Sequence, residues 1–296
     1  QSFSLAGLLT PGKTHALVIR LRSVVIEAMS RDCAPRQTRS WGVYTPEALR
    51  IRKPGHSYGW DIMPRAISAG LWRCVEIVEH SPNEFRDVYA YCLHATADKA
   101  ILDIHYVLNT TPAHLIDAEI HVVGRCAESR FETVRRIHRF AGLIGIEIEN
   151  PMLWWPLGYG DANLYEVSVE FRQAGRLLAS RTFNVGLRTV ILDRSPQPDQ
   201  RPGFLFTING VPILVKGSNW VPADAFHSRD AERIPRHLAL FVESGCNLVR
   251  CWGGNVYEDS TFFDQCDKLG LMVWQDFAMA CGLYPQDEAF AETIRR

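Results

Sequence analysis

Polar and aromatic side chains follow two short apolar runs late in the chain, and their types suit sugar recognition. Arg250 and Trp252 follow the first run, and Trp274 and Asp276 follow the second. If both runs are parallel strands, these groups lie at carboxyl ends, where barrel enzymes carry their functional residues. A sugar ring has C–H faces that stack on indoles and hydroxyls that bind carboxylates, amides and guanidinium groups. The two strand ends therefore predict a carbohydrate site.

Each of these residues also has a purely structural explanation. A tryptophan at a strand end often packs half-buried against its neighbours. Gly253 and Gly254 can mark a turn with positive φ. The same combination of groups at two successive strand ends favours a ligand site.

The chain from about residue 196 onward alternates between strand and helix patterns, which is typical of a parallel sheet. Asn209-Gly210 predicts a tight hairpin between residues 204–208 and 211–216. A complete (β/α)8 TIM barrel needs about 250 residues, so residues 196–296 can hold only its first part. Two helices are expected between the strands: one from Ser228 or Asp230 to near Ser244 with Gly245 as its terminator, and one from about Asp259 to Gly270.

Residues 82–195 show strand patterns at short intervals, which indicate an immunoglobulin-like β-sandwich. Charged and apolar residues alternate in Glu166–Phe171, as expected where one sheet face lies in water. The sequence Trp154-Trp155-Pro156 is interpreted chiefly as packing between domains. The expected strands are Val88–His94, Ala100–Leu108, Ala118–Val123, Ile144–Ile148, Tyr165–Arg172 and Leu177–Val185.

The first 81 residues show a strand, a long loop and a second strand. The expected strands are Leu17–Leu21 and Leu71–Val78. The polar stretch between them is too long for a simple hairpin, and long structured loops are often functional. Trp60 and Asp61 lie in this stretch among other aromatic and charged residues. A turn capped by Asp61 and packed by Trp60 is the structural alternative.

Charge and cysteine usage exclude several classes of protein. The 296 residues contain 32 Lys and Arg against 33 Asp and Glu, so no long-range field favours nucleic acid or an anionic membrane. The basic segment Arg125–Arg139 also contains glutamates and is interpreted as a solvated strand or loop. The sequence contains no stretch of about 18 apolar residues, so it predicts no membrane span.

The eight cysteines form no Cys-x-x-Cys pair, so a zinc site is not expected. Scattered free thiols favour a reducing compartment such as the cytoplasm, with a lysosomal or periplasmic location as alternatives. The chain begins without Met and enters strand-like sequence directly, so we expect it to be part of a longer protein.

Taken together, these motifs resemble the β-mannosidase branch of glycoside hydrolase family 2. Agreement is densest from Phe206 to Pro285, and weaker agreement, which includes Tyr58–Asp61 and Gly70–Arg73, covers most of the rest. The motifs that carry the resemblance are Ile208-Asn209-Gly210-Val211-Pro212, Lys216-Gly217-Ser218-Asn219-Trp220-Val221-Pro222-Ala223-Asp224, Arg250-Cys251-Trp252-Gly253-Gly254, Tyr257-Glu258-Asp259 and Val273-Trp274-Gln275-Asp276-Phe277.

The resemblance implies three domains. These are the C-terminal part of a galactose-binding-like jelly-roll in residues 1–81, the sandwich in residues 82–195 and the first part of a catalytic TIM barrel in residues 196–296. Asn219 and Asp224 are expected to support the loop after the first barrel strand. The implied substrate-binding residues are Trp60, Asp61, Arg250, Trp252, Trp274 and Asp276.

Members of this family hydrolyse glycosides with retention, using two glutamates. By resemblance both come from later barrel strands, expected beyond Arg296, so no catalytic residue is assigned here. The only Asn-Glu pair of the kind that carries the family's acid/base is Asn83-Glu84, which lies in an interdomain linker. Glu258 and Asp259 are interpreted as the capped start of a helix.

The implied activity is removal of terminal non-reducing β-D-mannose from oligosaccharides or glycans, without a metal or cofactor. We expect these 296 residues alone to be inactive. One alternative is another family 2 exo-glycosidase, namely a β-glucuronidase, β-galactosidase or exo-glucosaminidase. The Trp-Gly-Gly sequence after Arg250 and the Trp-Gln-Asp-Phe sequence favour the mannosidase. The other alternative is a non-catalytic carbohydrate-binding module built on the sandwich.

Overall fold

A computed structural model describes residues 3–10, 12–31, 46–196 and 203–295. They form two compact units, one of residues 1–73 with 281–296 and one of residues 74–280. No helix in these ranges is long and apolar enough to span a membrane. The described elements of the first unit are α1 (Val24–Met29), η1 (Pro46–Leu49), η2 (Gly55–Tyr58) and α4 (Glu288–Arg295).

The two strands expected in the first 81 residues are not formed, and this part of the prediction is wrong. Leu17–Leu21 and Leu71–Val78 have no regular secondary structure. Leu17, Val18 and Ile19 are 67%, 89% and 46% exposed, so successive side chains all lie in water. A preference for strand structure expresses packing on a half-buried, pleated surface. Among the described residues neither segment has such a surface.

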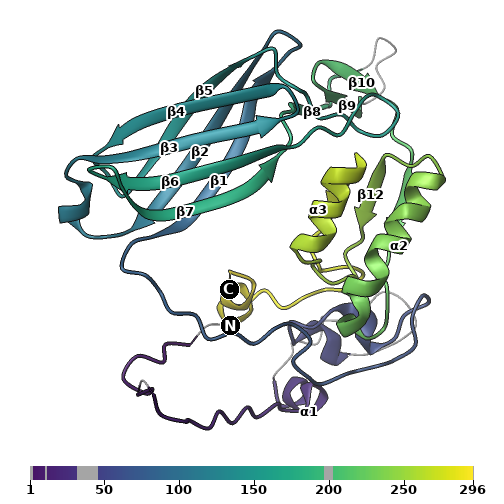
Figure 1. The fold of residues 1–296 in the computed structure, drawn as a ribbon. Helices are drawn as coiled ribbons and strands as arrows, with labels where there is room; N and C mark the ends of the chain where they lie inside the picture. The colour runs from purple at the N-terminus through teal and green to yellow at the C-terminus, as the bar shows by residue number, and fades with distance from the viewer. Residues whose placement is uncertain (1–2, 11, 32–45, 197–202, 296) are drawn as a thin grey trace. The chain divides into compact units, whose positions relative to one another are not determined.

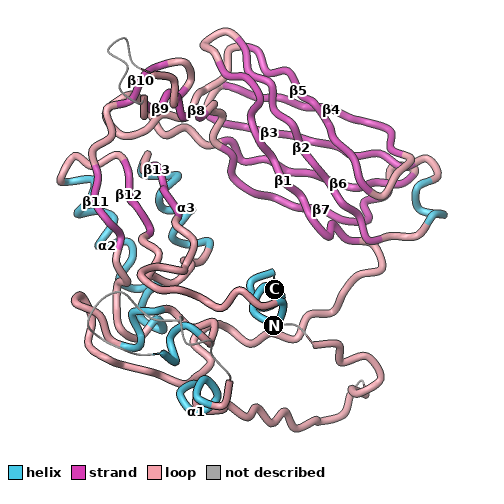
Figure 2. The backbone as a smooth tube through the Cα atoms, turned by 180° about the vertical axis from the view of Figure 1, so that it is seen from behind, coloured by secondary structure: helices cyan, strands magenta, loops and turns pink. Residues whose placement is uncertain are grey.

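The second unit contains a sandwich of two antiparallel sheets, with strand orders β1-β2-β5 and β4-β3-β6-β7 (Figures 1 and 2). Alternate side chains of each strand enter the core, as Ile120 and Val122 of β3 do. This arrangement agrees with the expected sandwich. The strands are β1 (Glu84–Ala95), β2 (Lys99–Asn109), β3 (Ala118–Cys126), β4 (Ser129–Ile137), β5 (Ala141–Glu149), β6 (Tyr165–Gln173) and β7 (Arg176–Val185).

Strand β4 is present in the structure but is not among the strands expected from the sequence, because it falls in the basic segment Arg125–Arg139. It forms the edge of its sheet, and most of its side chains are exposed, although Phe131 and Ile137 are buried. An edge strand with few buried positions shows little alternation in sequence. The interpretation of this segment as a solvated strand is confirmed.

A second group of elements follows the sandwich, and its three parallel strands pair in the order β11-β12-β13. This confirms the parallel sheet expected from the alternating pattern. Both helices end where expected, at Gly245 with φ 72° and Gly270 with φ 69°. The elements are β11 (Gly217–Trp220), α2 (Asp230–Glu243), β12 (Leu248–Cys251), α3 (Ser260–Leu269) and β13 (Met272–Gln275).

The expected hairpin is formed by β9 (Leu205–Ile208) and β10 (Val211–Ile213), and β8 (Val190–Asp193) pairs with the other side of β9. Its two turn residues, Asn209 and Gly210, have φ values of 49° and 78°. Positive φ at both central residues defines the turn whose twist suits a two-residue hairpin.

Helices α2 and α3 pack together over the parallel sheet (Figure 1). Buried side chains from all three elements meet there, including Leu238 of α2, Phe262 of α3 and Val249 of β12. Burial of such side chains is the main favourable term in folding. One face of β12 is thus covered by helices, which leaves its other face for the polar residues.

The sandwich is joined to α3 by Trp154, which is almost completely buried. Its indole Nε1 donates to the backbone carbonyl of Asp267 at 2.7 Å. Arg188 lies 4.4 Å from the centre of the Trp154 ring and forms an ion pair with the Asp267 carboxylate at 3.1 Å. The backbone N–H of Leu157 also donates to the Gly270 carbonyl at 2.8 Å. Trp154 thus packs between the sandwich and α3, as expected, whereas Trp155 packs against the sandwich core.

We expect Gly270→Ala to destabilise the chain more than Gly245→Ala. Both glycines end a helix with positive φ, which costs a residue with Cβ about 1 kcal/mol. A Cβ at Gly270 would also lie 2.9 Å from the backbone N of Leu157, whereas nothing lies within 4 Å of a Cβ at Gly245. Overpacking should add about 1–3 kcal/mol at Gly270. Equal losses of unfolding free energy in urea would contradict this contact.

Candidate functional site

Because the three parallel strands pair in register, polar side chains come together at the carboxyl end of the sheet. Asn219 of β11 lies opposite Arg250 of β12, which lies opposite Trp274 of β13. Side chains alternate between the two faces of a strand, and Val249 and Cys251 pack in the core under the helices. Arg250 and its row neighbours therefore lie on the face away from α2 and α3.

Arg250 is the centre of a hydrogen-bonded cluster at this end of the sheet. Its Nη2 and Nε donate to the two carboxylate oxygens of Asp276 at 2.7 and 3.3 Å, and its Nη1 donates to Asn219 Oδ1 at 3.1 Å. The Asp276 N–H donates to the Cys251 carbonyl at 3.0 Å, which keeps the carboxylate beside β12. The Arg250 and Asp276 side chains are 38% and 22% exposed. The ordered pair is thus open to a ligand in water.

The Trp252 ring lies directly over Gly254 in the turn that follows β12. A Cβ on Gly254 would lie 2.1 Å from the ring, and a Cβ on Gly253 would lie 2.8 Å from the Phe277 carbonyl oxygen. Both glycines lie in a turn, but neither has positive φ, so the explanation by positive φ is wrong. Both positions need glycine because other groups approach the backbone too closely for a side chain.

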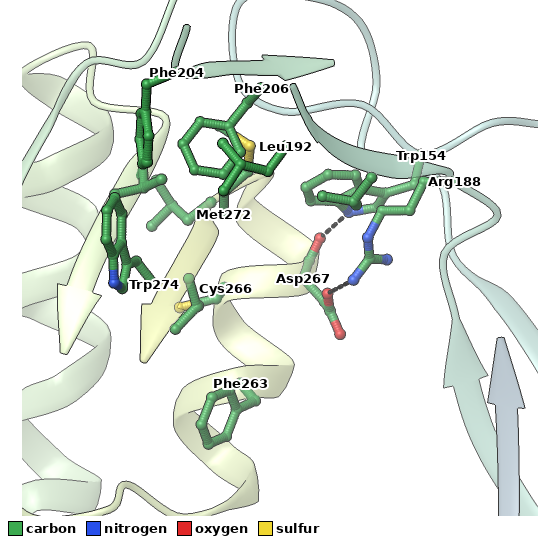
Figure 3. A pocket seen from close by; sticks show the side chains of 14 residues that line it. Trp154, Arg188, Leu192, Phe204, Phe206, Phe263, Cys266, Asp267, Met272 and Trp274 are labelled. Carbon is green, nitrogen blue, oxygen red and sulfur yellow. Dashed lines mark hydrogen bonds and ion pairs between the residues drawn. The ribbon is translucent and has the colours of Figure 1, made fainter. Parts of the chain in front are cut away.

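The Trp274 ring packs against two phenylalanines. Its centre is 5.7 Å from that of Phe204, with which it stacks, and 6.2 Å from that of Phe206. All three rings line a cavity of about 620 Å³ that extends to α3 and the Arg188–Asp267 ion pair (Figure 3). The indole remains 40% exposed.

This cavity does not coincide with the polar cluster. Its lining is mostly apolar, and it includes neither Arg250 nor Asp276. A sugar site needs a few convergent polar groups to bind the hydroxyls. We therefore place the candidate site at the Arg250 cluster, with the cavity as an apolar neighbour on the β13 side.

Trp60 and Asp61 lie in a tight turn of the first unit. The Trp60 N–H donates to the Met63 carbonyl at 2.9 Å, and the Met63 N–H donates to the Trp60 carbonyl at 3.3 Å. Asp61 is exposed in this turn. The approach of these two residues to the Arg250 cluster in the other unit remains a prediction.

The two residues expected to support the first barrel loop have different partners. Asn219 holds Arg250, as described above. Asp224 is buried; its Oδ1 accepts from the Phe226 N–H at 2.8 Å, and its Oδ2 lies 2.8 Å from Arg233. Burial raises the pKa of Asp224, but the Phe226 N–H and the arginines outweigh it and lower the pKa overall. Asp224 thus ties the loop after β11 to α2.

Glu258 is a buried carboxyl group that the sequence pattern missed. It lies before the first residue of α3 and is 9% exposed, and its Oε1 accepts from the Trp220 indole N–H at 2.8 Å. Burial raises the pKa of Glu258 to about 7. The interpretation of Glu258 as a capping residue is wrong, because the loop turns its side chain inward. Asp259 occupies the N-cap position without a side-chain capping bond.

Glu84 of the Asn83-Glu84 pair lies at the start of β1 in the sandwich. Its carboxylate contacts His80 Nδ1 at 3.1 Å and accepts from Asn109 Nδ2 at 3.2 Å. The bonds to His80 and Asn109 lower the pKa of Glu84. Because these partners favour the charged form of the Glu84 carboxylate, the structure does not support a role for Glu84 as a proton donor.

The chain is similar to several known glycoside hydrolases. Residues 87–188 match the model of the family "Glycosyl hydrolases family 2". The chain is 34% identical over 290 residues to beta-mannosidase B of Aspergillus fumigatus, with 95% of this chain and 34% of that protein covered. It is also 34% identical over 256 residues to beta-mannosidase B of Neosartorya fischeri, with 85% of this chain and 30% of that protein covered.

Among solved structures, the fold is similar to that of a beta-D-mannosidase from Dictyoglomus thermophilum. The TM-score is 0.80 at 29% sequence identity, with 92% of this chain and 34% of that chain covered. The chain thus spans about a third of the length of the relatives that it matches.

We expect Glu258→Gln to stabilise the chain relative to wild type above pH 7. The Glu258 pKa is about 7 in the folded chain against 4.5 for an ordinary glutamate. Unfolding therefore releases a proton between these values, so the favourable contribution is full below pH 4.5 and falls as the pH rises to about 7. The total loss is about 3 kcal/mol.

Urea unfolding from pH 4 to 8 measures this difference. Glu243→Gln, at an exposed position on α2, serves as the control and should follow wild type. A constant difference between Glu258→Gln and wild type at all pH values would show that Glu258 does not titrate in this range.

Proposed function

This chain belongs to glycosyl hydrolases family 2, and we propose that it is part of a retaining enzyme that removes terminal β-D-mannose from oligosaccharides or glycans. The observation that carries the proposal is the Arg250–Asp276–Asn219 cluster, in a chain of which 95% aligns with a beta-mannosidase B. The assignment of residues 1–81, 82–195 and 196–296 to a jelly-roll, a sandwich and the first part of a barrel is part of this proposal.

The Arg250 cluster suits the charged and hydroxylated transition state of glycoside hydrolysis. Arg250 has five N–H donors in a planar fork, and its bonds to Asp276 and Asn219 fix the plane while further donors remain. A fixed cation beside the nucleophilic carboxylate lowers the pKa of that carboxylate and keeps it charged. Asp276 can accept from sugar hydroxyls on the exposed side.

Aromatic rings provide the stacking surfaces in this proposal. Trp252 and Trp274 border the Arg250 cluster from the ends of neighbouring strands. Trp60 and Asp61 would approach from the first unit and close the site around the terminal sugar.

The two catalytic glutamates of the proposed mechanism are not assigned to any described residue. Glu84 lies in the sandwich, and Glu258 is buried beneath Trp220 on the helix side of the sheet. A retaining enzyme needs two carboxyl groups about 5 to 5.5 Å apart across the sugar. We propose that both lie in the part of the relatives' length that this chain does not span.

The 296-residue chain should therefore release no measurable product from an aryl β-mannoside. The whole protein should hydrolyse the β-mannoside faster than the matching β-glucuronide, β-galactoside and β-glucosaminide. Turnover by the chain alone would refute the placement of the glutamates, and preference for another glycoside would refute the mannosidase assignment.

A binding experiment distinguishes sugar binding at the Arg250 cluster from sugar binding by a module on the sandwich. The sheet β1-β2-β5 carries a partly exposed aromatic row in which Tyr91 stacks on Tyr89 at 5.7 Å and meets His105 at 5.5 Å. This row is the observation that favours a binding module. The enzyme proposal predicts that it makes no difference to sugar affinity.

We expect Arg250→Lys to weaken binding of methyl β-D-mannoside to the chain about tenfold, because lysine cannot hold Asp276 and Asn219 together. Tyr89→Ala and the exposed control Arg236→Lys should bind like wild type in a calorimetric or NMR titration. If Tyr89→Ala abolishes binding and Arg250→Lys does not, the sandwich module is the correct function.

A further inference from the structure

The loop between β12 and α3 contacts the segments on both sides of Arg250. On the β11 side, Asn255 Nδ2 donates to the Trp220 carbonyl at 3.3 Å and Glu258 accepts from the Trp220 indole at 2.8 Å. On the β13 side, the Tyr257 hydroxyl accepts from the Ala278 N–H at 2.9 Å. This loop therefore braces the two segments that supply Asn219 and Asp276.

The Glu258 contact is a buried part of this brace. Trp220 is 2% exposed, and its ring packs against Phe262 and Phe241, with ring centres 5.0 and 6.0 Å away. A buried indole N–H without an acceptor costs about 1–3 kcal/mol. Glu258 meets this requirement and so holds the last residue of β11 in place. The preceding residue, Asn219, points to the other face and accepts from Arg250.

The surroundings of Glu258 favour its neutral form. Burial is the main reason that its pKa rises to about 7, and Asp230 and Asp259 raise it further, whereas the Trp220 bond and His227 lower it. Asp230 pairs with His227 at 2.6 Å. The titratable groups that face Glu258 are His227 and Asp230 before and at the start of α2, Asp259 at the start of α3, and the thiols of Cys251 in β12 and Cys266 in α3.

We propose that Glu258 is a positioning residue of the candidate sugar site: in the closed loop its buried carboxyl holds Trp220 and thereby the Asn219–Arg250 bond, and its ionisation opens the loop and so releases both. This proposal rests on the proposed function in one respect only, which is that the Arg250 cluster is taken as the sugar site. Glu258 does not touch the sugar, because it lies buried on the helix side of the sheet. Its effect reaches Arg250 through β11.

The sign of the effect follows from the two states of the loop. When the loop is closed, Glu258 is buried and retains its proton up to about pH 7; when the loop is open, the carboxyl is hydrated and loses the proton near its ordinary value of 4.5. Raising the pH between these values therefore favours the open loop. Across the whole interval the closed-to-open ratio falls by about 300-fold.

Nuclear magnetic resonance of the isotopically labelled chain from about pH 4 to 9 tests the proposal. The indole ¹⁵N signal of Trp220 reports on the Glu258 bond, and the guanidinium ¹³C signal of Arg250 reports on the site. Trp220→Phe and Arg250→Lys assign the two signals by their loss. In wild type we expect both signals to shift with one common midpoint between pH 4.5 and about 7.

Glu258→Gln keeps the acceptor for the indole but cannot ionise, so both signals should stay constant over this range. The exposed control Glu243→Gln should titrate like wild type. Constant Arg250 signals in wild type, or titration that persists in Glu258→Gln, would overturn the proposal. The measurement uses no sugar, so its result is independent of whether the chain binds or hydrolyses mannosides.

Discussion

The candidate site depends on one constraint, which is the in-register parallel pairing of β11, β12 and β13. This pairing places Asn219, Arg250 and Trp274 in one row and brings Asp276 next to the end of β12. A shift by one residue would turn Arg250 toward the helices and bury its charge, because strand side chains alternate between faces. The hydrophobic core under α2 and α3 therefore sets the register, and the register in turn sets the polar cluster.

Helix α3 connects this sheet to the sandwich. The Trp154 indole N–H donates to a backbone carbonyl near the end of α3. The Leu157 N–H donates to the carbonyl of Gly270, the residue that terminates α3. Since β13 begins two residues after Gly270, these contacts also locate the strand that leads to Asp276. The sandwich thus positions part of the candidate site although it carries none of the Arg250 cluster.

The two ionic features of the sheet differ in what they contribute. The Arg250–Asp276 pair is partly exposed, and pairs of this kind add little to stability, about 0–1 kcal/mol. Its value lies in the fixed orientation of the guanidinium. Glu258 is the opposite case, since burial makes its charged form costly and links the loop after β12 to pH. In the proposed site, the first group would contact a ligand, and the second would control the backbone behind it.

The sequence by itself determined the features that obey short-range rules. Asn209-Gly210 specified the hairpin, Gly245 and Gly270 specified the helix ends, and alternating apolar positions specified most strands of the sandwich. Only the tertiary structure decided that Glu258 lies beneath Trp220, that Gly253 and Gly254 admit neighbouring groups, and that Leu17–Leu21 pairs with no strand among the described residues. Local patterns encode backbone conformation and the face that each side chain takes, whereas burial and strand pairing depend on residues far away in the chain.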